Sequence, residues 1–371
     1  MLALAKGGYT RDQVISLLHY KKGGRKVSYR YALLNKDDVK IGELKAQLGG
    51  SITLNSLAQI KRTANFTFSE SELADVDWLN DRIRPIFILE MPNGDKLEWA
   101  LGTFLLSSPS RKYQNRVTRD VEAYDANVIL VEDKFDNRYR IAAGTGYISA
   151  INDILNSAGI WKINIMPHAG TLSTDREFEI GTSKLTVINQ LLSEINYTSL
   201  WIDETGYAVA KPYVLPTDRE AEYEYKTDSI SIMQPDTVNE VDLFGVPNVW
   251  VVTASNPEKV PLVSRYINDS PASKTSTVSR NRRIVDFREL ADIYDQATLD
   301  AYAQRIAYES SQIHDRMLFT TAVMPHHTYS DMLQIEHSKL DVSDKYVETS
   351  WTLNLSSGGL QSHECRRVIT I

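Results

Sequence analysis

The chain has almost no cysteine and no long apolar run. Cys365 is the single cysteine among 371 residues, so no disulfide can form within the chain. This composition is compatible with a reducing compartment. The longest apolar runs, such as Ile86 to Leu89 and Val249 to Val252, have strand length and fall far short of a membrane span. The apolar run after Met1 is too short for a signal peptide. We therefore expect a soluble protein with no membrane-spanning segment and no visible export signal.

An excess of basic residues is also absent. The chain holds 41 Lys and Arg against 48 Asp and Glu, a formal net charge of −7, and the two signs are well mixed. A dedicated nucleic-acid binder concentrates Lys and Arg on one face to contact phosphates, so this class is disfavoured. The length and the apolar content of 42% allow about two to four domains, each with its own core.

A β-hairpin around Asn93 and Gly94 is the clearest local signal. Two β-prone runs, Ile86 to Leu89 and Leu97 to Leu106, flank the sequence Pro-Asn-Gly-Asp. Asn-Gly supplies the two positive-φ residues that a type I′ turn requires. The sequence therefore predicts an antiparallel hairpin within Arg82 to Pro109, closed by a type I′ turn.

Short strands dominate the chain before Asp125. A helix from Asp12 to His19, with Thr10 as its N-cap, precedes them and ends at Lys22-Gly23-Gly24. The predicted strands are Val27 to Leu34, Ile52 to Leu54, Ala64 to Phe68, the two hairpin strands and Arg116 to Tyr124. Strands at this spacing predict a closed or nearly closed barrel.

After Asp125 the pattern changes to a small α+β module. Thr145 can cap a helix that runs to Ser157, and Thr182 can cap a second helix that ends at Asn196. Strands from Tyr197 to Ile202 and from Tyr207 to Tyr213 follow, separated by Glu-Thr-Gly. Pro212 and Pro216 mark the exit of this module.

Strands return in the remainder of the chain. Pro247 to Thr253 is its strongest β signal, whereas Ser255 to Arg283 is polar and rich in Pro, Ser and Thr and predicts surface loops. Asp295 or Thr298 can cap a helix to about Arg316. Alternation then resumes between Leu318 and Ile371 and predicts a second β-rich body.

Several loose motifs follow one another along nearly the whole chain. They are the hairpin with Leu101 to Phe104, Val121 to Asp125, Ala143 to Tyr147 opening a helix, Ile188 to Leu192 before a strand, Asp242 to Asn248, and Gly358-Gly359 leading into Arg366 to Ile369. In this order the motifs resemble those of phage tail hub proteins, the ring-forming proteins of the tail tip or baseplate, including the N-terminal module of tail-associated lysin-type proteins.

The resemblance implies a mainly-β, α+β fold with two antiparallel β-barrel-like domains and an inserted small α+β region. It also implies a homotrimer, whose ring adapts the sixfold tail tube to threefold fibre or spike proteins and frames the DNA exit channel. The implied partners are distal tail or tube proteins, the tape measure protein and the fibre or spike proteins, with DNA passing transiently through the lumen. The implied location is the tail tip of a virion assembled in the host cytoplasm.

Carried onto this chain, the resemblance predicts four regions. They are residues 1–128, the first barrel with its N-terminal helix; 129–215, the middle α+β domain; 216–255 with 318–371, the second barrel; and 256–317, a loop-and-helix insertion beside the middle domain. The hairpin strands would form part of the ring wall, with their outer edges facing a neighbouring chain. We expect no further C-terminal domain, because the sequence stops just after the last barrel strand.

Metal binding and nucleophilic catalysis are the enzymatic alternatives. The densest set of candidate ligands is His326, His327, Asp331 and His337. Adjacent histidines in a strand point to opposite faces and do not easily share one ion, so we favour a polar loop after Pro325. Cys365 would share a strand face with His363, but no third orienting group is specified, so we favour a packed terminal strand. We therefore predict neither a metal nor a cofactor.

Other possible catalytic motifs have simpler interpretations. Gly144-Thr-Gly146 lacks the spacing and the Lys of a phosphate-binding loop and predicts a turn into a capped helix. The acidic pairs Asp37-Asp38 and Glu132-Asp133 lie in predicted loops with no apolar pocket to raise a pKa. The six tryptophans are scattered, as core residues would be, rather than gathered into a sugar-binding platform.

One basic cluster remains. It comprises Arg280, Arg282, Arg283 and Arg288. Contact with DNA in the tail lumen is conceivable, but a conduit should not bind its cargo tightly. Arg-rich loops commonly form ion pairs between subunits, so we predict an inter-subunit interface here, with a solvated loop as the alternative.

The sequence thus predicts a structural, non-enzymatic tail protein. The alternative is a tail-associated, endopeptidase-like peptidoglycan hydrolase, which zymography with His326, His327 and Cys365 replaced in turn would detect. A third alternative is a carbohydrate-binding module, which requires an exposed aromatic groove.

Overall fold

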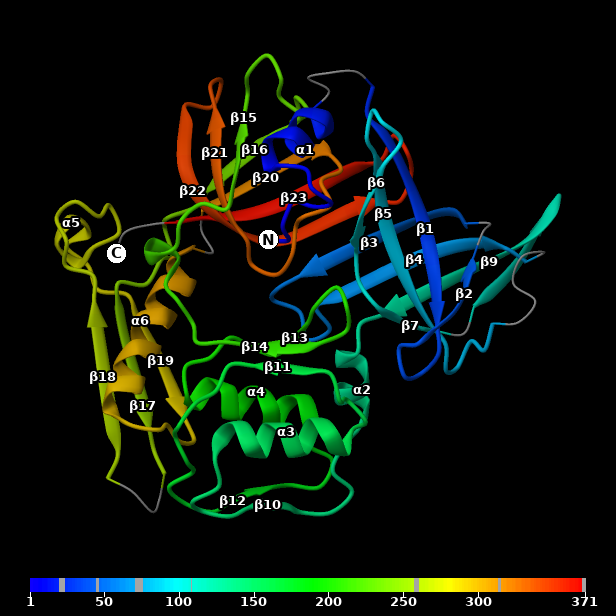
Figure 1. Cartoon of the computed structure of the whole chain (residues 1–371). Coiled ribbons are helices and arrows are strands. Elements are labelled where there is room, and N and C mark those ends of the chain that lie inside the picture. Colours follow the sequence, from blue (N-terminus) through cyan, green and yellow to red (C-terminus); the bar gives the residue numbers. More distant parts are fainter. Residues whose placement is uncertain are drawn as a thin grey trace.

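The computed structural model describes residues 1–19, 24–44, 47–70, 76–107, 109–256, 260–312 and 315–368. Strands dominate and helices are few, so the predicted α+β, mainly-β class is confirmed (Figure 1). Three predicted features lie partly outside the described residues: the Lys22-Gly23 helix end, the last turn of the helix toward Arg316, and the strand end at Ile369 to Ile371. No helix in the described ranges is long and apolar enough to cross a membrane.

The first part of the chain forms a helix and nine strands. The helix α1 (Arg11–Leu18) begins with the predicted cap, because the Thr10 hydroxyl accepts from Gln13 N while the Gln13 side chain accepts from Thr10 N. The strands are β1 (Lys26–Leu34), β2 (Lys40–Leu44), β3 (Gln47–Asn55), β4 (Arg62–Ser69), β5 (Arg82–Glu90), β6 (Lys96–Ala100), β7 (Phe104–Leu106), β8 (Ser110–Gln114) and β9 (Arg116–Tyr124).

The strands of the second predicted barrel join this same sheet. They are β15 (Tyr223–Lys226), β16 (Val238–Val241), β20 (Asp315–Ala322), β21 (Met332–His337), β22 (Val342–Asn354) and β23 (Leu360–Arg367). The connection arises because β22 is 13 residues long, so Ser350 to Asn354 extend to pair with Asn55 to Ser51 of β3. Among the described residues the main path runs open from β16 to β2, and one apolar core extends from Leu4 to Cys365. The two predicted barrels therefore share one sheet and one core and do not close separately.

The middle unit packs two helices between small sheets. Its elements are α2 (Asn127–Glu132), β10 (Tyr139–Ile141), α3 (Tyr147–Ser157), β11 (Ile163–Ile165), β12 (Arg176–Phe178), α4 (Lys184–Glu194), β13 (Trp201–Ile202) and β14 (Ala208–Ala210), with the 3-10 helix η2 (Pro216–Asp218) after it. In Figure 1, α3 and α4 lie between the β11-β14-β13 sheet and the β10-β12 ladder. Both predicted helices are present, but Gly146 and Ser183 occupy the N-cap positions instead of Thr145 and Thr182.

A third unit corrects the predicted insertion. It contains β17 (Val249–Ala254), β18 (Leu262–Ile267), α5 (Thr277–Arg280), β19 (Val285–Leu290) and α6 (Gln296–Gln312). The strand β17 pairs antiparallel with β18 and parallel with β19, and α6 covers one face, where Trp250 Nε1 donates to Ser310 Oγ at 2.7 Å. Placing residues 249–255 in the second barrel was therefore wrong, and the region predicted as loops, Ser255 to Arg283, contains the strand β18 and the short helix α5.

The hairpin of β5 and β6 has the predicted pairing but not the predicted turn. Gly94 has φ 90°, whereas Asn93 is not among the described residues with positive φ. Gly94 N donates to Met91 O at 2.9 Å, and Met91 N donates to Asp95 O at 2.8 Å. This is a type I turn followed by a left-handed glycine, which suits Pro92 because its fixed φ matches the second position of a type I turn.

The hairpin at β6 contacts the chain's own N-terminal segment. Lys6 Nζ donates to Glu98 O, Trp99 Nε1 donates to Ala3 O at 3.0 Å, and the Tyr9 hydroxyl donates to Asp95 Oδ2 at 2.6 Å. The Glu98 carbonyl of β6 is therefore paired within the chain, and the expectation that the outer edges of the hairpin face a neighbouring chain stays a prediction.

Replacing Gly94 by valine should lower the free energy of unfolding by about 1–2 kcal/mol, because a β-branched residue is strained at positive φ. A Cβ at Gly94 meets nothing within 4 Å, so the cost comes from the backbone alone. Gly42→Val is the matched control, since Gly42 also has open space around its Cβ position and an ordinary φ. Urea denaturation measures both variants, and equal midpoints would contradict the strained-turn interpretation.

Candidate functional site

The four arginines of the predicted interface do not form one patch. Arg280 donates to Val246 O at 3.1 Å and to Leu243 O, and the Arg282 guanidinium donates to Phe244 O at 3.0 Å and lies 5.1 Å from the Phe244 ring centroid. These two side chains hold the loop before β17. Arg283 is exposed, and Arg288 on β19 lies 3.2 Å from Asp286. The inter-subunit role of these arginines stays a prediction.

The predicted histidine cluster is only partly assembled. His326 and His327 lie outside the strands, as the predicted loop after Pro325 requires, but this turn is buried, and the two ring centroids are 4.7 Å apart. Both ring nitrogens of His326 are buried without a hydrogen-bond partner in the described part of the chain. His337 ends β21 and accepts from Leu340 N at 3.2 Å. Asp331 accepts from Thr328 N at 2.6 Å and lies 3.8 Å from His327 Nδ1.

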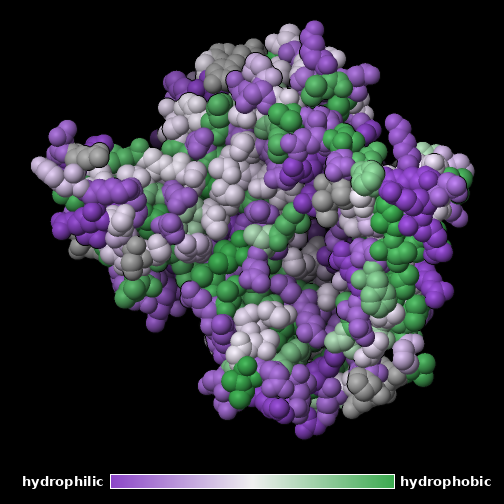
Figure 2. Space-filling view, turned by 180° about the vertical axis from the view of Figure 1, so that it is seen from behind, coloured by the Kyte–Doolittle hydropathy of each residue, from purple (hydrophilic) through white to green (hydrophobic). Residues whose placement is uncertain are grey.

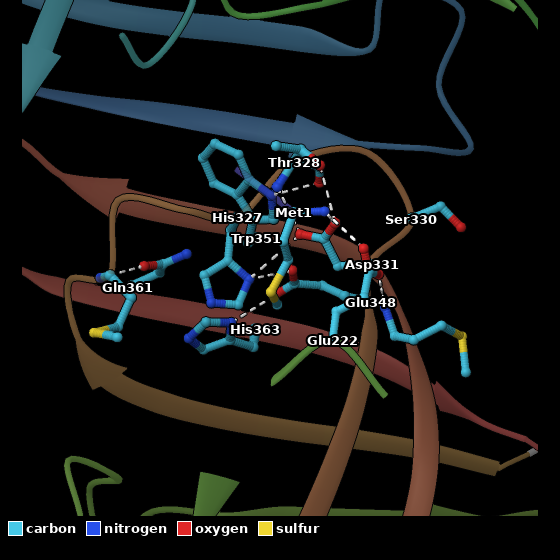
Figure 3. Close-up of polar contacts among 12 residues, drawn as sticks. Met1, Glu222, His327, Thr328, Ser330, Asp331, Glu348, Trp351, Gln361 and His363 are labelled. Carbon is cyan, nitrogen blue, oxygen red and sulfur yellow. Dashed lines mark hydrogen bonds and ion pairs between the residues drawn. The ribbon is translucent and has the colours of Figure 1, made fainter. Parts of the chain in front are cut away.

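The buried carboxylate of Glu348 joins two histidines that come from different segments (Figure 3). Its Oε2 atom lies 2.6 Å from His327 Nδ1, and its Oε1 atom lies 2.5 Å from His363 Nδ1. The other ring nitrogens also have partners: His327 Nε2 lies 2.7 Å from the Tyr225 hydroxyl, and His363 Nε2 lies 2.8 Å from Thr321 Oγ1. All four imidazole nitrogens of this pair are therefore hydrogen-bonded.

Burial sets the protonation of this network. Loss of solvent raises the pKa of Glu348 from 4.5 to about 7 and lowers the pKa of His327 to about 4. The pKa of His363 is also lowered by burial, although its hydrogen bond to Glu348 opposes the shift. Near neutral pH the two imidazoles are uncharged and Glu348 is close to its titration midpoint. Asp331 and Glu222 extend the polar region, because the Met1 amine lies 2.9 Å and 2.8 Å from their oxygens (Figure 3).

The side chains of this network are also of the kinds that bind transition metals. The possible ligand atoms of His327, Glu348 and His363 lie within 4.8 Å of one another. Donor atoms around one tetrahedral Zn²⁺, each at about 2.0–2.1 Å, are roughly 3.3 Å apart. The observed 2.5 and 2.6 Å separations are those of hydrogen bonds. The geometry fits a buried structural network better than a metal centre.

A β-bulge explains why Glu348 was missed in the sequence. Trp351, Leu353 and Leu355 point into the core, and extending that alternation backward places Glu348 outside. The β22–β23 register shifts between Glu348 and Ser350. This bulge inserts an extra residue, so odd-numbered residues face the core after it and even-numbered residues face the core before it. The shift turns Glu348 inward.

The remaining candidates occupy structural positions. Cys365 shares the inward face of β23 with His363, as predicted, and burial raises the pKa of its thiol far above the ordinary value, which disfavours a nucleophilic thiolate. Gly144, with φ 82°, lies in a turn before α3. Asp38 is paired with Arg82 and Lys162 at 2.7 Å each, and Asp133 with Lys184 at 2.5 Å.

An apolar surface lies on the face of the β18-β17-β19 sheet away from α6. Residues that alternate along its edge strands are about half exposed there: Val263 (46%), Ile267 (47%), Val285 (54%) and Phe287 (60%). Figure 2, which views the molecule from behind, shows hydrophobic residues gathered along this side. We call these four residues the outer face. The exposed polar side chains Arg265 and Glu289 lie on the same face. Exposed apolar side chains accompanied by polar ones on one sheet face are typical of a protein–protein contact.

Solved structures with the same fold include tail proteins, two of them from prophages. No protein-family model and no curated protein sequence matches this chain. A tail protein from Neisseria meningitidis superposes with a TM-score of 0.67 at 10% identity, covering 91% of this chain and 96% of that one. The 43 kDa tail protein of prophage MuSo2 from Shewanella oneidensis gives 0.60 at 10% identity, covering 91% and 98%. A prophage tail protein from Listeria monocytogenes gives 0.56 at 10% identity, covering 91% and 94%. The predicted resemblance is confirmed at the level of the fold.

Proposed function

We propose that this chain, which has the fold of phage tail proteins, is a structural component of a phage or prophage-derived tail tip or baseplate. The observation that carries the proposal is the agreement in fold over 91% of the chain with three tail proteins. In the proposed assembly, three copies form a hub ring that connects the sixfold tail tube to threefold fibre or spike proteins. The ring contacts the tape measure protein, frames the DNA exit channel, and assembles in the host cytoplasm before entering the virion.

A non-enzymatic role is part of this proposal. All three residues considered as catalytic are buried: His326, His327 and Cys365. In the Glu348 network, both ring nitrogens of His327 and of His363 already have hydrogen-bond partners. A hydrolase requires its nucleophile or metal-bound water to reach a polymeric substrate.

We further propose that the outer face contacts a second copy of the chain. It exposes apolar side chains on a sheet whose edge strands β18 and β19 each pair only with β17 among the described strands. Burying such a face and its strand edges against another copy removes both apolar surface and unpaired backbone groups from water.

Replacing Phe287 by aspartate should weaken trimer formation at least about thirtyfold, the loss expected for a central aromatic contact worth roughly 2 kcal/mol. Sedimentation equilibrium of the purified protein, and incorporation into assembled tails, measure the effect. Leu79→Asp is the matched control, because Leu79 is 83% exposed on a turn elsewhere. Unchanged association of the Phe287 variant in both assays would reject the outer face as the contact. If the wild-type chain is a monomer both in solution and in assembled tails, the proposed trimeric ring is contradicted.

A further inference from the structure

A cleft of about 690 Å³ lies where the large sheet, the middle unit and the third unit meet. The loop that contains Lys61 lines one side, and Lys211 after β14 lines another. The helix α6 contributes Arg305 and Glu309, and β23 contributes Arg366. Its volume is in the range of pockets that hold ligands or peptide side chains.

Cationic side chains outnumber acidic ones in the lining of the cleft, although Arg219, Arg288 and Arg305 each lie within 3.3 Å of a carboxylate. Its cationic lining residues are Lys61, Lys211, Arg219, Arg288, Arg305 and Arg366. Glu309 is the one acidic side chain among the described lining residues. The whole chain carries a net charge of −7, so this concentration of positive charge is local and attracts anionic groups.

One of these cations, Lys61, is buried without a carboxylate contact. Lys61 is 6% exposed, and its Nζ donates to the backbone oxygens of Ser56 at 2.9 Å and Ala58 at 2.8 Å. Burial lowers the pKa of Lys61 to about 8, so it is still mostly charged at neutral pH. The Nε atom of Arg366 is buried and has no hydrogen-bond partner in the described ranges. An unpaired buried donor is costly unless a ligand supplies the acceptor.

The cleft also carries exposed apolar side chains. Leu57, Met166 and Val214 are 61%, 51% and 50% exposed. The aromatic rings nearby are already covered, because Tyr329 stacks on Trp201 at 5.1 Å and the Arg305 guanidinium lies 4.3 Å from the Tyr213 ring. Bases of single-stranded nucleic acid need open ring faces for stacking, and these rings do not offer them.

We infer that this cleft binds an acidic peptide segment of another protein, with its carboxylates on the basic floor and its apolar side chains on Leu57, Met166 and Val214. Arg288, one of the four arginines singled out in the sequence, contributes to this site. Peptide capture does not require ring formation, so the two properties can fail separately.

Selection from an unbiased displayed dodecapeptide library against the full chain tests this inference. Peptides rich in Asp and Glu with interspersed apolar residues should be enriched. Fluorescence anisotropy with a labelled selected peptide should show binding that weakens with added salt. Lys211→Glu combined with Arg288→Glu should raise its Kd at least about tenfold, since both side chains are exposed and both charges are reversed.

Lys339→Glu is the control, because Lys339 is an exposed lysine on the turn between β21 and β22. It should leave the Kd unchanged, and light scattering on the same samples reports ring formation independently. Selection of peptides without acidic enrichment, or equal binding by the double variant, would overturn the inference. Tighter binding of a dT oligonucleotide that the double variant loses would assign the cleft to nucleic acid instead. If the double variant changes only self-association, the occupant is another copy of the chain.

Discussion

Replacing Glu348 by leucine is expected to lower the free energy of unfolding by about 3–5 kcal/mol. The carboxylate is fully buried and holds His327 at 2.6 Å and His363 at 2.5 Å. Leucine satisfies neither ring, so two buried polar nitrogens lose their partner at once. Guanidinium denaturation followed by circular dichroism measures the loss.

Glu364→Leu is the matched control for this change. Glu364 lies on the neighbouring strand β23, its side chain is 34% exposed, and it meets Arg316 at 3.4 Å. Removing an exposed ion pair of this kind costs at most about 1 kcal/mol. A Glu348 variant no more destabilised than the Glu364 variant would show that the network does not stabilise the fold.

Glu348→Gln separates the hydrogen bonds from the charge. An amide has the shape of a protonated carboxyl and can donate to one imidazole while accepting from the other, so this variant should fold. The folded-state pKa of Glu348, about 7, is above its ordinary 4.5. Its contribution to stability is therefore full below pH 4.5 and is lost as the pH rises through 7.

The glutamine variant lacks that loss. Its stability relative to wild type should therefore increase between pH 5 and pH 7, by up to about 2 kcal/mol. The lowered pKa of His327 makes stability rise with pH between 4 and 6.5, but it acts in both proteins with the same sign. Parallel denaturation curves at pH 5, 6 and 7 measure the difference. A constant offset would show that Glu348 has an ordinary pKa.

The sequence predicted features that depend on neighbouring residues. The Thr10–Gln13 capping box and the hairpin pairing of β5 with β6 were found because their signals lie within a few residues. The turn at Asn93 was assigned wrongly because Asn-Gly suits two turn types, and the adjacent Pro92 decides between them.

Features that depend on distant pairing were not predictable in the same way. The strand β17 has an ordinary β pattern, and only its partners β18 and β19 place it outside the large sheet. Glu348 faces the core because of a bulge whose position is set by pairing with β23. The fold, in contrast, was inferred from the order of loose motifs along the whole chain, which does not require the position of any single side chain.

A buried ion pair lies at the junction between the large sheet and the middle unit. Arg62 on β4 is 1% exposed, and its Nη2 lies 2.6 Å from Oε1 of Glu204 in the β13–β14 turn. Arg62→Leu should lower the free energy of unfolding by about 3–5 kcal/mol, because it leaves the Glu204 carboxylate buried without its partner. Chemical denaturation measures this, and hydrogen exchange should show early loss of protection in the β13–β14 hairpin.

The double variant Arg62→Leu, Glu204→Leu distinguishes an unpaired charge from lost packing. If the cost arises from the charge left behind, removing both partners should recover at least about half of the stability that either single variant loses. Arg138→Leu is the control, since Arg138 is 65% exposed and pairs with exposed Glu177 and Glu179, so its loss should cost under about 1 kcal/mol. Additive losses in the double variant would mean that Arg62 acts through its packing near Trp351 and Phe104 and not through Glu204. Because Lys61 and Lys211 line the basic cleft from the two sides of this junction, a variant that loosens it should also weaken peptide binding there.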